Sequence, residues 1–506
     1  MTDRQNTSMQ TGNGFPDSEY AGKKLWASKG FYSILAVALM VRLVFVFSAP
    51  FMGGDADIYT TVAENILRGC GVSLSDPGSS ECVPHFGGNQ LPGYPAFVAL
   101  VWFVADHSNM AVRVFQSFLY VAALGWLMIA IHRYTRSKGL AIGTGVVMAL
   151  SPLEVAWPRY MQTETLALAT TMWVLAELVI SLGEQKLRII PLALALTAAV
   201  FVRLDGILLC VPVALTAFLV HNPLKAMARG ALVALLLCLP LAGWTVRNIV
   251  VDLPRLYPTP FTMPDNAPPP LGYAAWGRTW ITQEYQRPGW GWPVNRFVYD
   301  GIQIDDRAYD NPEEKKQVQG LLDELKNYTG KPFPKEIDDQ FRRLAEERAE
   351  REPLRVRVWI PLLRMKSLWT NPYCSFGWPN EMPSSFSYEE RLAFTRGGIL
   401  GKVKLALKYP FRSASKALNG LYRFFLIFSF LAVALGSFFR RAGPGRRIVW
   451  IAMAVVLART VFMGIVGNVE TRYTVEAVPG MEMAVVWAVG ALWQWRSRRG
   501  KLLATS

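Results

Sequence analysis

Long apolar runs dominate the pattern of hydrophobic and polar positions along the chain. One spans residues 31–49 with Arg42 as its only charge, a second spans 140–157 and a third spans 231–244. Each approaches the roughly 20 residues that a helix needs to cross about 30 Å of hydrocarbon. The pattern therefore predicts an all-α polytopic membrane protein.

The runs predict about ten membrane crossings, and the charges between them predict an orientation. Lysine and arginine gather in every second loop and at both ends of the chain, which places both termini in the cytoplasm. Residues 50–109 and 251–417 then face outward. The predicted crossings are 31–49, 110–131, 140–157, 163–182, 188–202, 205–221, 230–250, 418–439, 448–466 and 474–495.

The same pattern divides the chain into four parts. They are a disordered cytoplasmic tail (1–30), an N-terminal transmembrane module (31–250), an outward-facing subdomain (251–417) and C-terminal transmembrane helices with a basic cytoplasmic tail (418–506). Apolar spacing in the first outward loop predicts interfacial helices at 57–68 and 95–105. Charged amphipathic helices are predicted at 312–352.

Composition agrees with a membrane protein and argues against a nucleic-acid partner. The 506 residues are 52% hydrophobic and 18% charged. The net charge of +15 comes from the short loops between apolar runs, as the positive-inside rule requires. Cys70 and Cys82 share the first outward loop, where an oxidising compartment would permit a disulfide, and two free thiols are the alternative. No Cys/His spacing resembles a zinc site.

Two acids, Asp55 and Asp57, stand where the first outward loop opens, directly after Gly53 and Gly54. Helix capping is one explanation and suits Asp57, since acids near a helix N-terminus accept free amides and favour the dipole. Asp55 is expected to lie beyond the cap, where a carboxylate can accept a proton from an acceptor hydroxyl or amine.

Arginines are predicted at the outer ends of three crossings, at Arg203, Arg247 and Arg472. Arginine at this depth is costly unless it is paired, and guanidinium binds phosphate in a bidentate geometry. The alternatives are snorkelling and pairing with nearby acids, which are Glu164, Asp205 and Glu470. Several tryptophans of the outward subdomain allow either sugar stacking or an interfacial belt: Trp276, Trp280, Trp290 and Trp292.

An ordered set of short motifs connects these residues. It comprises Asp55-x-x-x-Tyr59, Leu91-Pro92-Gly93-Tyr94-Pro95, Thr163-Glu164-Thr165, Arg203-Leu204-Asp205-Gly206, Trp244-x-x-Arg247-Asn248 and Glu470-Thr471-Arg472-Tyr473. The set resembles the GT-C superfamily of membrane glycosyltransferases. Within it, the resemblance is to the bacterial branch with dolichyl-phosphate-mannose protein mannosyltransferases and aminoarabinose transferases of lipid A. It covers roughly residues 31–250 and 418–480.

The resemblance implies a GT-C-like helical bundle and roles for individual residues. Asp55 matches the catalytic base of the family, and Asp57 stands where many relatives carry a second acid. Arg203 matches the usual Arg-Pro-x-Gly turn, with Leu204 in place of proline. The implied donor-phosphate site consists of Arg203, Arg247, Arg472 and His85. The implied acceptor-binding or orienting residues are Asp57, Tyr59, Glu164, Asn248 and Tyr473.

The function implied is an inverting glycosyltransferase of the bacterial inner membrane with a periplasmic active site. Its donor would be a polyprenyl-phosphate-linked sugar, and its acceptor a cell-envelope glycolipid, polysaccharide or protein. No tightly bound metal is required, because phosphate is the leaving group and no nucleotide is held; a divalent cation stays an open alternative. The rival function is a transporter or flippase of lipid-linked glycans, although the sequence shows no internal repeat of the kind such proteins often carry.

Overall fold

The computed structural model describes residues 25–48, 54–85, 87, 91–253, 263, 266–371, 387, 389–390, 397–439 and 444–504. Most of the tail expected at 1–30 lies outside these residues. The described residues form helices and no β-strand, apart from one isolated bridge between Ser73 and Pro84. The prediction of an all-α protein is confirmed.

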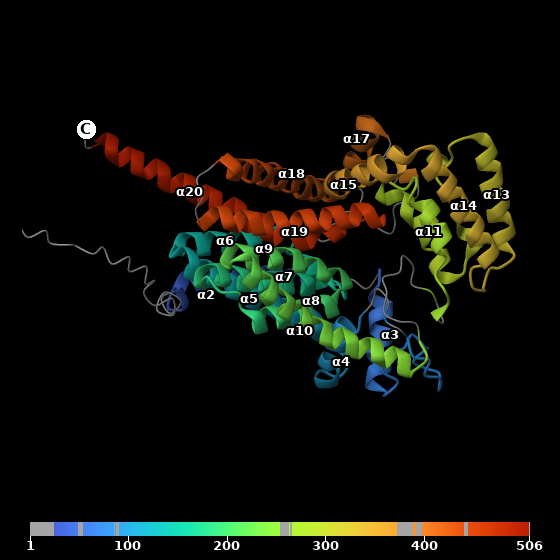
Figure 1. Ribbon diagram of the computed structural model, residues 1–506, viewed down its shortest axis with the longest axis horizontal. Coiled ribbons are helices and arrows are strands. Elements are labelled where there is room, and N and C mark those ends of the chain that lie inside the picture. Colours follow the sequence, from blue (N-terminus) through green and yellow to red (C-terminus); the bar gives the residue numbers. More distant parts are fainter. Residues whose placement is uncertain are drawn as a thin grey trace, which may run out of the picture.

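Seven helices of the described residues are long and apolar enough to cross a membrane. They run side by side and form the body of the molecule (Figure 1). The seven are α2 (Lys29–Ser48), α5 (Asn109–Thr135), α7 (Glu164–Glu184), α10 (Pro223–Val250), α18 (Pro410–Phe439), α19 (Pro444–Val466) and α20 (Val478–Ala504), with the 3-10 turn η9 (Thr471–Ala477) leading into α20.

The other three expected crossings are shorter than a membrane span, so the count of ten is not confirmed. The run predicted at 140–157 forms α6 (Lys138–Leu150), which stops two residues before Pro152 because a helix is disfavoured just ahead of proline. A 3-10 turn, η1 (Trp157–Arg159), follows. The runs predicted at 188–202 and 205–221 form α8 (Ile189–Val202) and the pair η2 (Leu204–Leu209) and α9 (Cys210–Val220).

Helix α7 lies at the centre of the bundle and is buried along nearly its whole length, packed mainly against α5 and α8. Helices α10 and α18 instead leave most of their apolar side chains exposed, among them Leu239 and Phe428. Lipid tails are as apolar as these side chains, so such faces are suited to the bilayer. The central core therefore forms around α7, with α10 and α18 at the periphery.

The first loop contains the two short helices that its pattern predicts, α3 (Ala56–Leu67) and α4 (Gly93–Val104). They pack on each other around Tyr59 and Tyr94, whose rings meet edge to face at 5.0 Å. Gly93 also lets α4 approach the end of α8 closely, because a Cβ there would lie 2.4 Å from the carbonyl oxygen of Phe201. We call the end of the bundle that carries this loop the loop end.

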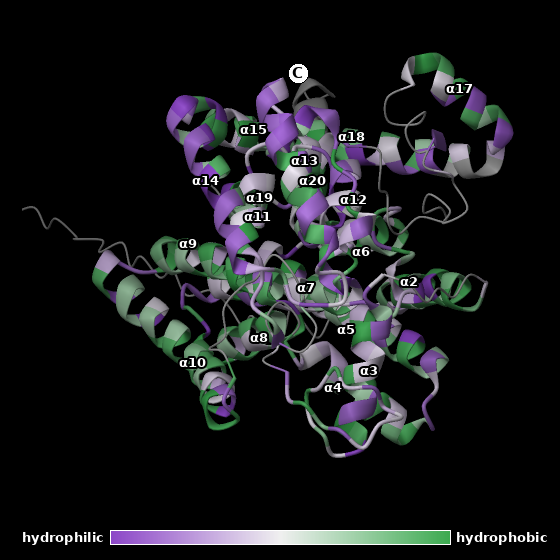
Figure 2. Cartoon of the chain, turned by 90° about the vertical axis from the view of Figure 1, so that its right-hand side faces the viewer, coloured by the Kyte–Doolittle hydropathy of each residue, from purple (hydrophilic) through white to green (hydrophobic). Residues whose placement is uncertain are grey.

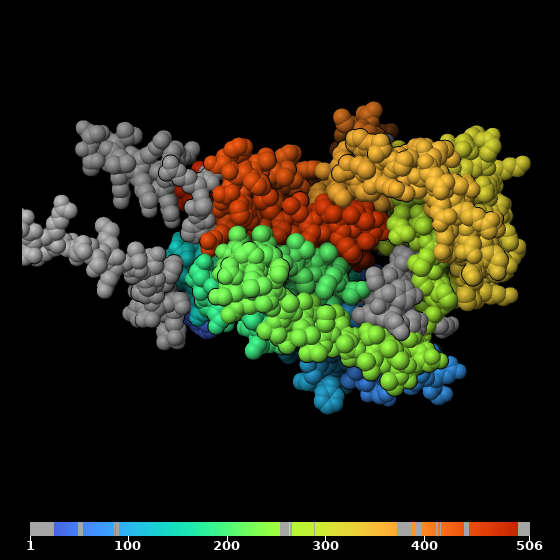
Figure 3. Space-filling view, in the orientation of Figure 1, coloured from blue at the N-terminus to red at the C-terminus, as the bar shows by residue number. Residues whose placement is uncertain are grey.

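A subdomain with its own aromatic core covers the loop end (Figures 1 and 3). Trp276, Trp280 and Trp290 are buried in this core, so neither explanation offered for them, sugar stacking or an interfacial belt, is correct; Trp292 is exposed. The helices of the subdomain are α11 (Leu271–Gly277), α12 (Arg287–Gly291), α13 (Pro312–Lys326) and α14 (Lys335–Arg351).

A continuous helical stretch leads from the subdomain back to the bundle. It includes a π-helical turn at Arg355–Trp359 and α15 (Ile360–Thr370), which packs on α19. The buried guanidinium of Arg364 donates hydrogen bonds to the carbonyl oxygens of Ile281 (2.8 Å) and Gly464 (3.2 Å). This contact fixes the subdomain to α19. Helix α17 (Gly398–Lys408) projects sideways from the same end (Figure 2).

Candidate active site

Asp55 occupies the N-cap position of α3, but its side chain makes no capping hydrogen bond. The expectation that Asp55 lies beyond the helix cap is therefore wrong, because Asp55 is itself the N-cap residue. Its carboxylate instead turns toward Arg472, whose Nη2 lies 3.1 Å from Oδ2. The side chain of Asp55 is 36% exposed, which leaves the other carboxylate oxygen within reach of a substrate.

Arg472 joins Asp55 to two further acids. Its Nε donates to Glu470 Oε2 at 2.7 Å, and its Nη1 lies 3.7 Å from Glu164 Oε1. Arg472 and Glu164 are largely buried, with side-chain exposures of 13% and 1%. Three carboxylates from the first loop, α7 and the turn before η9 thus hold one guanidinium in a fixed orientation.

Arg203 belongs to the same cluster and is also surrounded by acids. It contacts Asp205 Oδ1 (3.1 Å), Glu476 Oε1 (3.2 Å) and Glu164 Oε1 (3.4 Å). Glu164 therefore lies between Arg203 and Arg472. For Arg203 and Arg472, the structure therefore shows the alternative considered above, which is pairing with nearby acids.

Arg459 and Glu476 complete this network, and the motifs did not identify them. The buried Arg459 contacts Asp205 Oδ2 at 2.9 Å and Glu476 Oε2 at 3.2 Å. It also donates to the carbonyl oxygen of Tyr473 at 3.1 Å. A usable signal was present in the sequence, because an arginine within an apolar span is a functional-site candidate by default.

Glu470 connects the cluster to the subdomain through an ion pair with Arg287 of α12. Burial raises the pKa of the Glu470 carboxyl, but the guanidinium groups of Arg287 and Arg472 outweigh burial and hold that pKa below its ordinary value. Glu470 is therefore ionised at neutral pH. Arg287, like Arg459, was not found from the sequence.

The two tyrosines predicted at the site line the cluster. The guanidinium carbon of Arg203 lies 4.6 Å from the centre of the Tyr473 ring, and that of Arg472 lies 5.4 Å from it. Burial, together with the charges of Asp55 and Glu164, raises the pKa of Tyr59 well above its ordinary value. Tyr59 therefore keeps its proton and can act only as a neutral hydrogen-bonding group.

Arg247, Asn248 and His85 form a second group at the loop end. Arg247 Nη1 donates to the carbonyl oxygen of His85 (2.7 Å) and to Asn248 Oδ1 (2.9 Å). Its Nη2 donates to the carbonyl oxygen of Val72 (3.3 Å). Its guanidinium lies 4.9 Å from the Trp244 ring centre. Among the described residues, no carboxylate lies within ion-pair distance of Arg247.

His85 is buried, and its surroundings determine its charge. Burial, and next the positive charge of Arg247, lower the pKa of His85 from 6.5 to about 4. Its Nδ1 accepts the backbone N–H of Gly87 at 3.1 Å, which assigns the remaining proton of the neutral ring to Nε2. At neutral pH, His85 can offer a phosphate a hydrogen bond but not a positive charge.

The remaining predicted residues lie at the edge of the site. Asp57 is exposed on the first turn of α3, where it favours the helix dipole. Cys70 and Cys82 are joined by a disulfide, with their Cα atoms 5.3 Å apart. Within the part of the chain that the structure describes, no group of three or more His, Cys, Asp or Glu residues is arranged to hold a metal ion.

Comparisons with known proteins give distant similarities only. No protein-family model and no curated protein matches the chain. The crystal structure of ArnT from Cupriavidus metallidurans bound to undecaprenyl phosphate aligns with a TM-score of 0.36 and 14% identity, over 90% of this chain and 77% of that one. Its apo structure aligns with a TM-score of 0.35 and 13% identity over the same shares.

Proposed function

We propose that this chain is an inverting glycosyltransferase that transfers a sugar from a polyprenyl-phosphate donor to a cell-envelope acceptor. The observation that carries the proposal is the Asp55 carboxylate, accessible on one side and held by Arg472 on the other. A base with this geometry is suited to take a proton from an incoming hydroxyl or amine.

Donor phosphate is assigned to Arg247 rather than to the arginines of the acidic cluster. Arg203 and Arg472 already face Glu164, Asp205, Glu470 and Glu476, which neutralise their charge. Arg247 makes its hydrogen bonds to neutral oxygens, so its positive charge remains available to an anion. In this assignment Arg472 is a positioning residue for Asp55, and Arg203 is a positioning residue for Glu164.

The reaction is a single displacement. Asp55 accepts the proton of the acceptor, whose oxygen or nitrogen forms a bond to the anomeric carbon while the bond from that carbon to the phosphate oxygen breaks. The electron pair of the broken bond stays on the lipid phosphate, next to Arg247, which stabilises the negative charge. Attack opposite to the leaving group inverts the anomeric configuration.

The proposed setting is the bacterial inner membrane, with the loop end in the periplasm and both termini in the cytoplasm. Basic loops at the opposite end of the helices support this orientation. The exposed apolar faces of α10 and α18 support contact with lipid over the length of the bundle.

The test is transfer of label from a radiolabelled polyprenyl-phosphate sugar in proteoliposomes that also contain an envelope extract as acceptor. We expect label on a second molecule with the wild-type protein and none with Asp55→Asn. Label that crosses the bilayer while still attached to the donor would indicate a flippase. Label that neither crosses nor changes carrier would contradict both functions.

A further inference from the structure

Arg423 of α18, like Arg247 and Arg364, has no carboxylate partner among the described residues. Its Nη2 donates to the carbonyl oxygen of Leu368 (2.6 Å) and to Thr474 Oγ1 (3.0 Å). No carboxylate of the described residues is within ion-pair distance. The carboxylate of Glu284 attracts Arg423 electrostatically from beyond ion-pair distance. This carboxylate accepts hydrogen bonds from the backbone N–H and the hydroxyl of Thr471.

This lack of a partner distinguishes Arg423 from its neighbours. Arg203, Arg459 and Arg472 lie at a similar level of the bundle, and each contacts at least two carboxylates. A guanidinium in an apolar helix is costly without a compensating anion. Arg364 also lacks a carboxylate, but all three of its nitrogens donate to carbonyl oxygens, whereas only Nη2 of Arg423 has a partner in the part of the chain that the structure describes. Arg423 therefore keeps nitrogens that can bind an anion from outside the chain.

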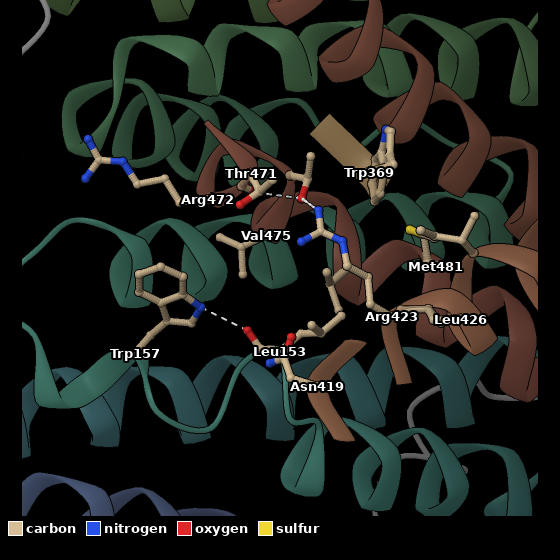
Figure 4. A pocket seen from close by; sticks show the side chains of 13 residues that line it. Leu153, Trp157, Trp369, Asn419, Arg423, Leu426, Thr471, Arg472, Val475 and Met481 are labelled. Atoms are coloured by element: carbon tan, nitrogen blue, oxygen red, sulfur yellow. Dashed lines mark hydrogen bonds between the residues drawn. The ribbon is translucent and has the colours of Figure 1, made fainter. Parts of the chain in front are cut away.

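A small cavity lies beside Arg423, between α18, α20 and the turn before η1 (Figure 4). Its volume is about 30 Å³, enough for one or two water molecules. Figure 4 shows the Arg423 guanidinium at the edge of this space. The other lining residues are Leu153, Trp157, Trp369, Asn419, Leu426, Ile427, Thr471, Arg472, Val475, Val478 and Met481.

The walls of the cavity limit the kind of anion. Apart from Arg423, Arg472, two threonines and Asn419, the lining residues are apolar, and the Arg472 guanidinium points away from the space (Figure 4). On the side of α18 that carries Arg423, the apolar residues Leu426 and Ile427 line the cavity. An anion attached to an apolar chain fits this surrounding better than a free ion does, because the chain can follow α18 while the head group meets Arg423.

We propose that Arg423 binds the phosphate of a membrane amphiphile at a site between α18 and α20, separate from the donor phosphate at Arg247. Guanidinium pairs with phosphate through two parallel hydrogen bonds, which suits the nitrogens of Arg423 that the protein leaves unused. Because the cavity is smaller than a phosphate group, binding parts α18 from α20. Two amphiphiles offer this chemistry, a phospholipid and the polyprenyl phosphate that the proposed reaction releases.

The experiment measures lipid binding to the full-length protein in detergent, without sugar, by native mass spectrometry and by the ligand-induced shift of Tm. The probes are short-chain phosphatidic acid, short-chain polyprenyl phosphate and inorganic phosphate. The variants are Arg423→Met, which keeps the apolar stem, and Arg423→Lys, which keeps the charge. For the polyprenyl phosphate probe each is also made in the Arg247→Met background, because this probe fits the donor site at Arg247 as well.

We expect Arg423→Met to weaken binding of one phosphate lipid about tenfold or more, which corresponds to the loss of a charge-assisted hydrogen bond. Arg423→Lys should retain part of that binding. Arg247→Met alone should keep all binding of phosphatidic acid and lose only the polyprenyl phosphate held at the donor site. Loss in the phosphatidic acid arm identifies a phospholipid, and loss in the polyprenyl arm identifies the reaction product.

Equal binding of both lipids to the wild type and Arg423→Met overturns the proposal. If inorganic phosphate binds as tightly as the lipids, the proposal that the ligand is a membrane amphiphile is wrong. If Arg423→Met does not fold, the Arg423→Lys comparison decides, since equal binding to it and the wild type would show that the bidentate geometry is not used. None of these results depends on sugar transfer, so they leave the proposed glycosyltransferase activity to its own test.

Discussion

Arg472 Nη2 lies 3.1 Å from Asp55 Oδ2, although 417 positions of the chain separate the two residues. Asp55 comes from the cap of a short helix in the first loop, and Arg472 from the turn that leads into the last membrane helix. The contact therefore forms only when the N-terminal and C-terminal parts of the bundle are assembled.

Asp55→Asn should abolish sugar transfer while leaving the fold intact. Asparagine can still accept a hydrogen bond from Arg472 but cannot take up a proton, so we expect kcat to fall by about 10²–10⁴. The matched control is Asp57→Asn on the exposed first turn of α3, which should stay within about threefold of wild type. Initial rates of transfer check both, and equal losses in the two variants would contradict the role given to Asp55.

Arg247→Met and Arg203→Met should fail in different ways. Without Arg247, no buried carboxylate loses its partner, so Tm should change little while KM for the donor rises about tenfold or more. Without Arg203, the buried Glu164 and Glu476 lose part of their compensation, which should cost roughly 3–5 kcal/mol of stability.

Thermal unfolding in detergent and donor titrations separate the two outcomes. A large fall in Tm for Arg247→Met, or a raised KM for Arg203→Met at unchanged Tm, would reverse the assignment of donor phosphate.

Most of the fold followed from local patterns, because apolar length and helical spacing record burial directly. The helices at 56–67 and 93–104, each within two residues of the predicted bounds, are examples. The third crossing was placed too long because Pro152, a local stop signal, was passed over. Trp276 was misplaced because its burial depends on α14, which lies 60 residues later in the chain.

The sequence predicted which residues form the site better than it predicted which of them form ion pairs. Asp55, Glu164, Arg203 and Arg472 meet as expected from their positions at helix ends. Which arginine faces acids depends on packing between distant helices, and Arg459 reaches Asp205 across 254 positions. No motif spacing contains that information, so the distinction between neutralised arginines and Arg247 required the structure.

His85 predicts an acid sensitivity of the first loop. Its pKa in the folded protein is about 4, below the ordinary value of 6.5, so the unfolded chain binds a proton first as pH falls. The stability contributed by neutral His85 is present above pH 6.5 and is lost as pH falls through about 4. The full loss is about 3 kcal/mol.

Tm measured from pH 7.5 to 4 checks this, with His85→Asn as the comparison, because its side-chain oxygen can replace Nδ1 as acceptor for Gly87. The variant should lose less Tm than the wild type over this range. Parallel curves for the two proteins would show that His85 does not titrate in the predicted way.

Reduction of the Cys70–Cys82 disulfide should weaken donor binding as well as stability. The bridge closes a loop with a sequence separation of 12, and a loop of this size contributes about 3 kcal/mol in the chain-entropy model. Val72 lies inside this loop and His85 lies shortly after it, and the carbonyl oxygens of both hold Arg247. A Cys70→Ser/Cys82→Ser variant should therefore show lower Tm and higher donor KM, and an unchanged KM would separate the loop from the donor site.

Gly206→Ala tests whether the Arg203 turn depends on close backbone packing. A Cβ at Gly206 would lie 2.6 Å from the carbonyl carbon and oxygen of Ala199, and backbone atoms cannot rotate away as a side chain can. We expect a loss of about 1–3 kcal/mol, as for other overpacked positions. Because the displaced turn carries Arg203 and Asp205, transfer activity should fall together with Tm.

The matched control is Gly243→Ala in α10, where an added Cβ meets nothing within 4 Å. Alanine favours the helix over glycine by up to about 1 kcal/mol, so this variant should be as stable as the wild type or more stable. Thermal unfolding of the two variants gives the comparison. If Gly206→Ala unfolds at the wild-type temperature and keeps full activity, the turn tolerates displacement, and Arg203 does not need the position that the structure gives it.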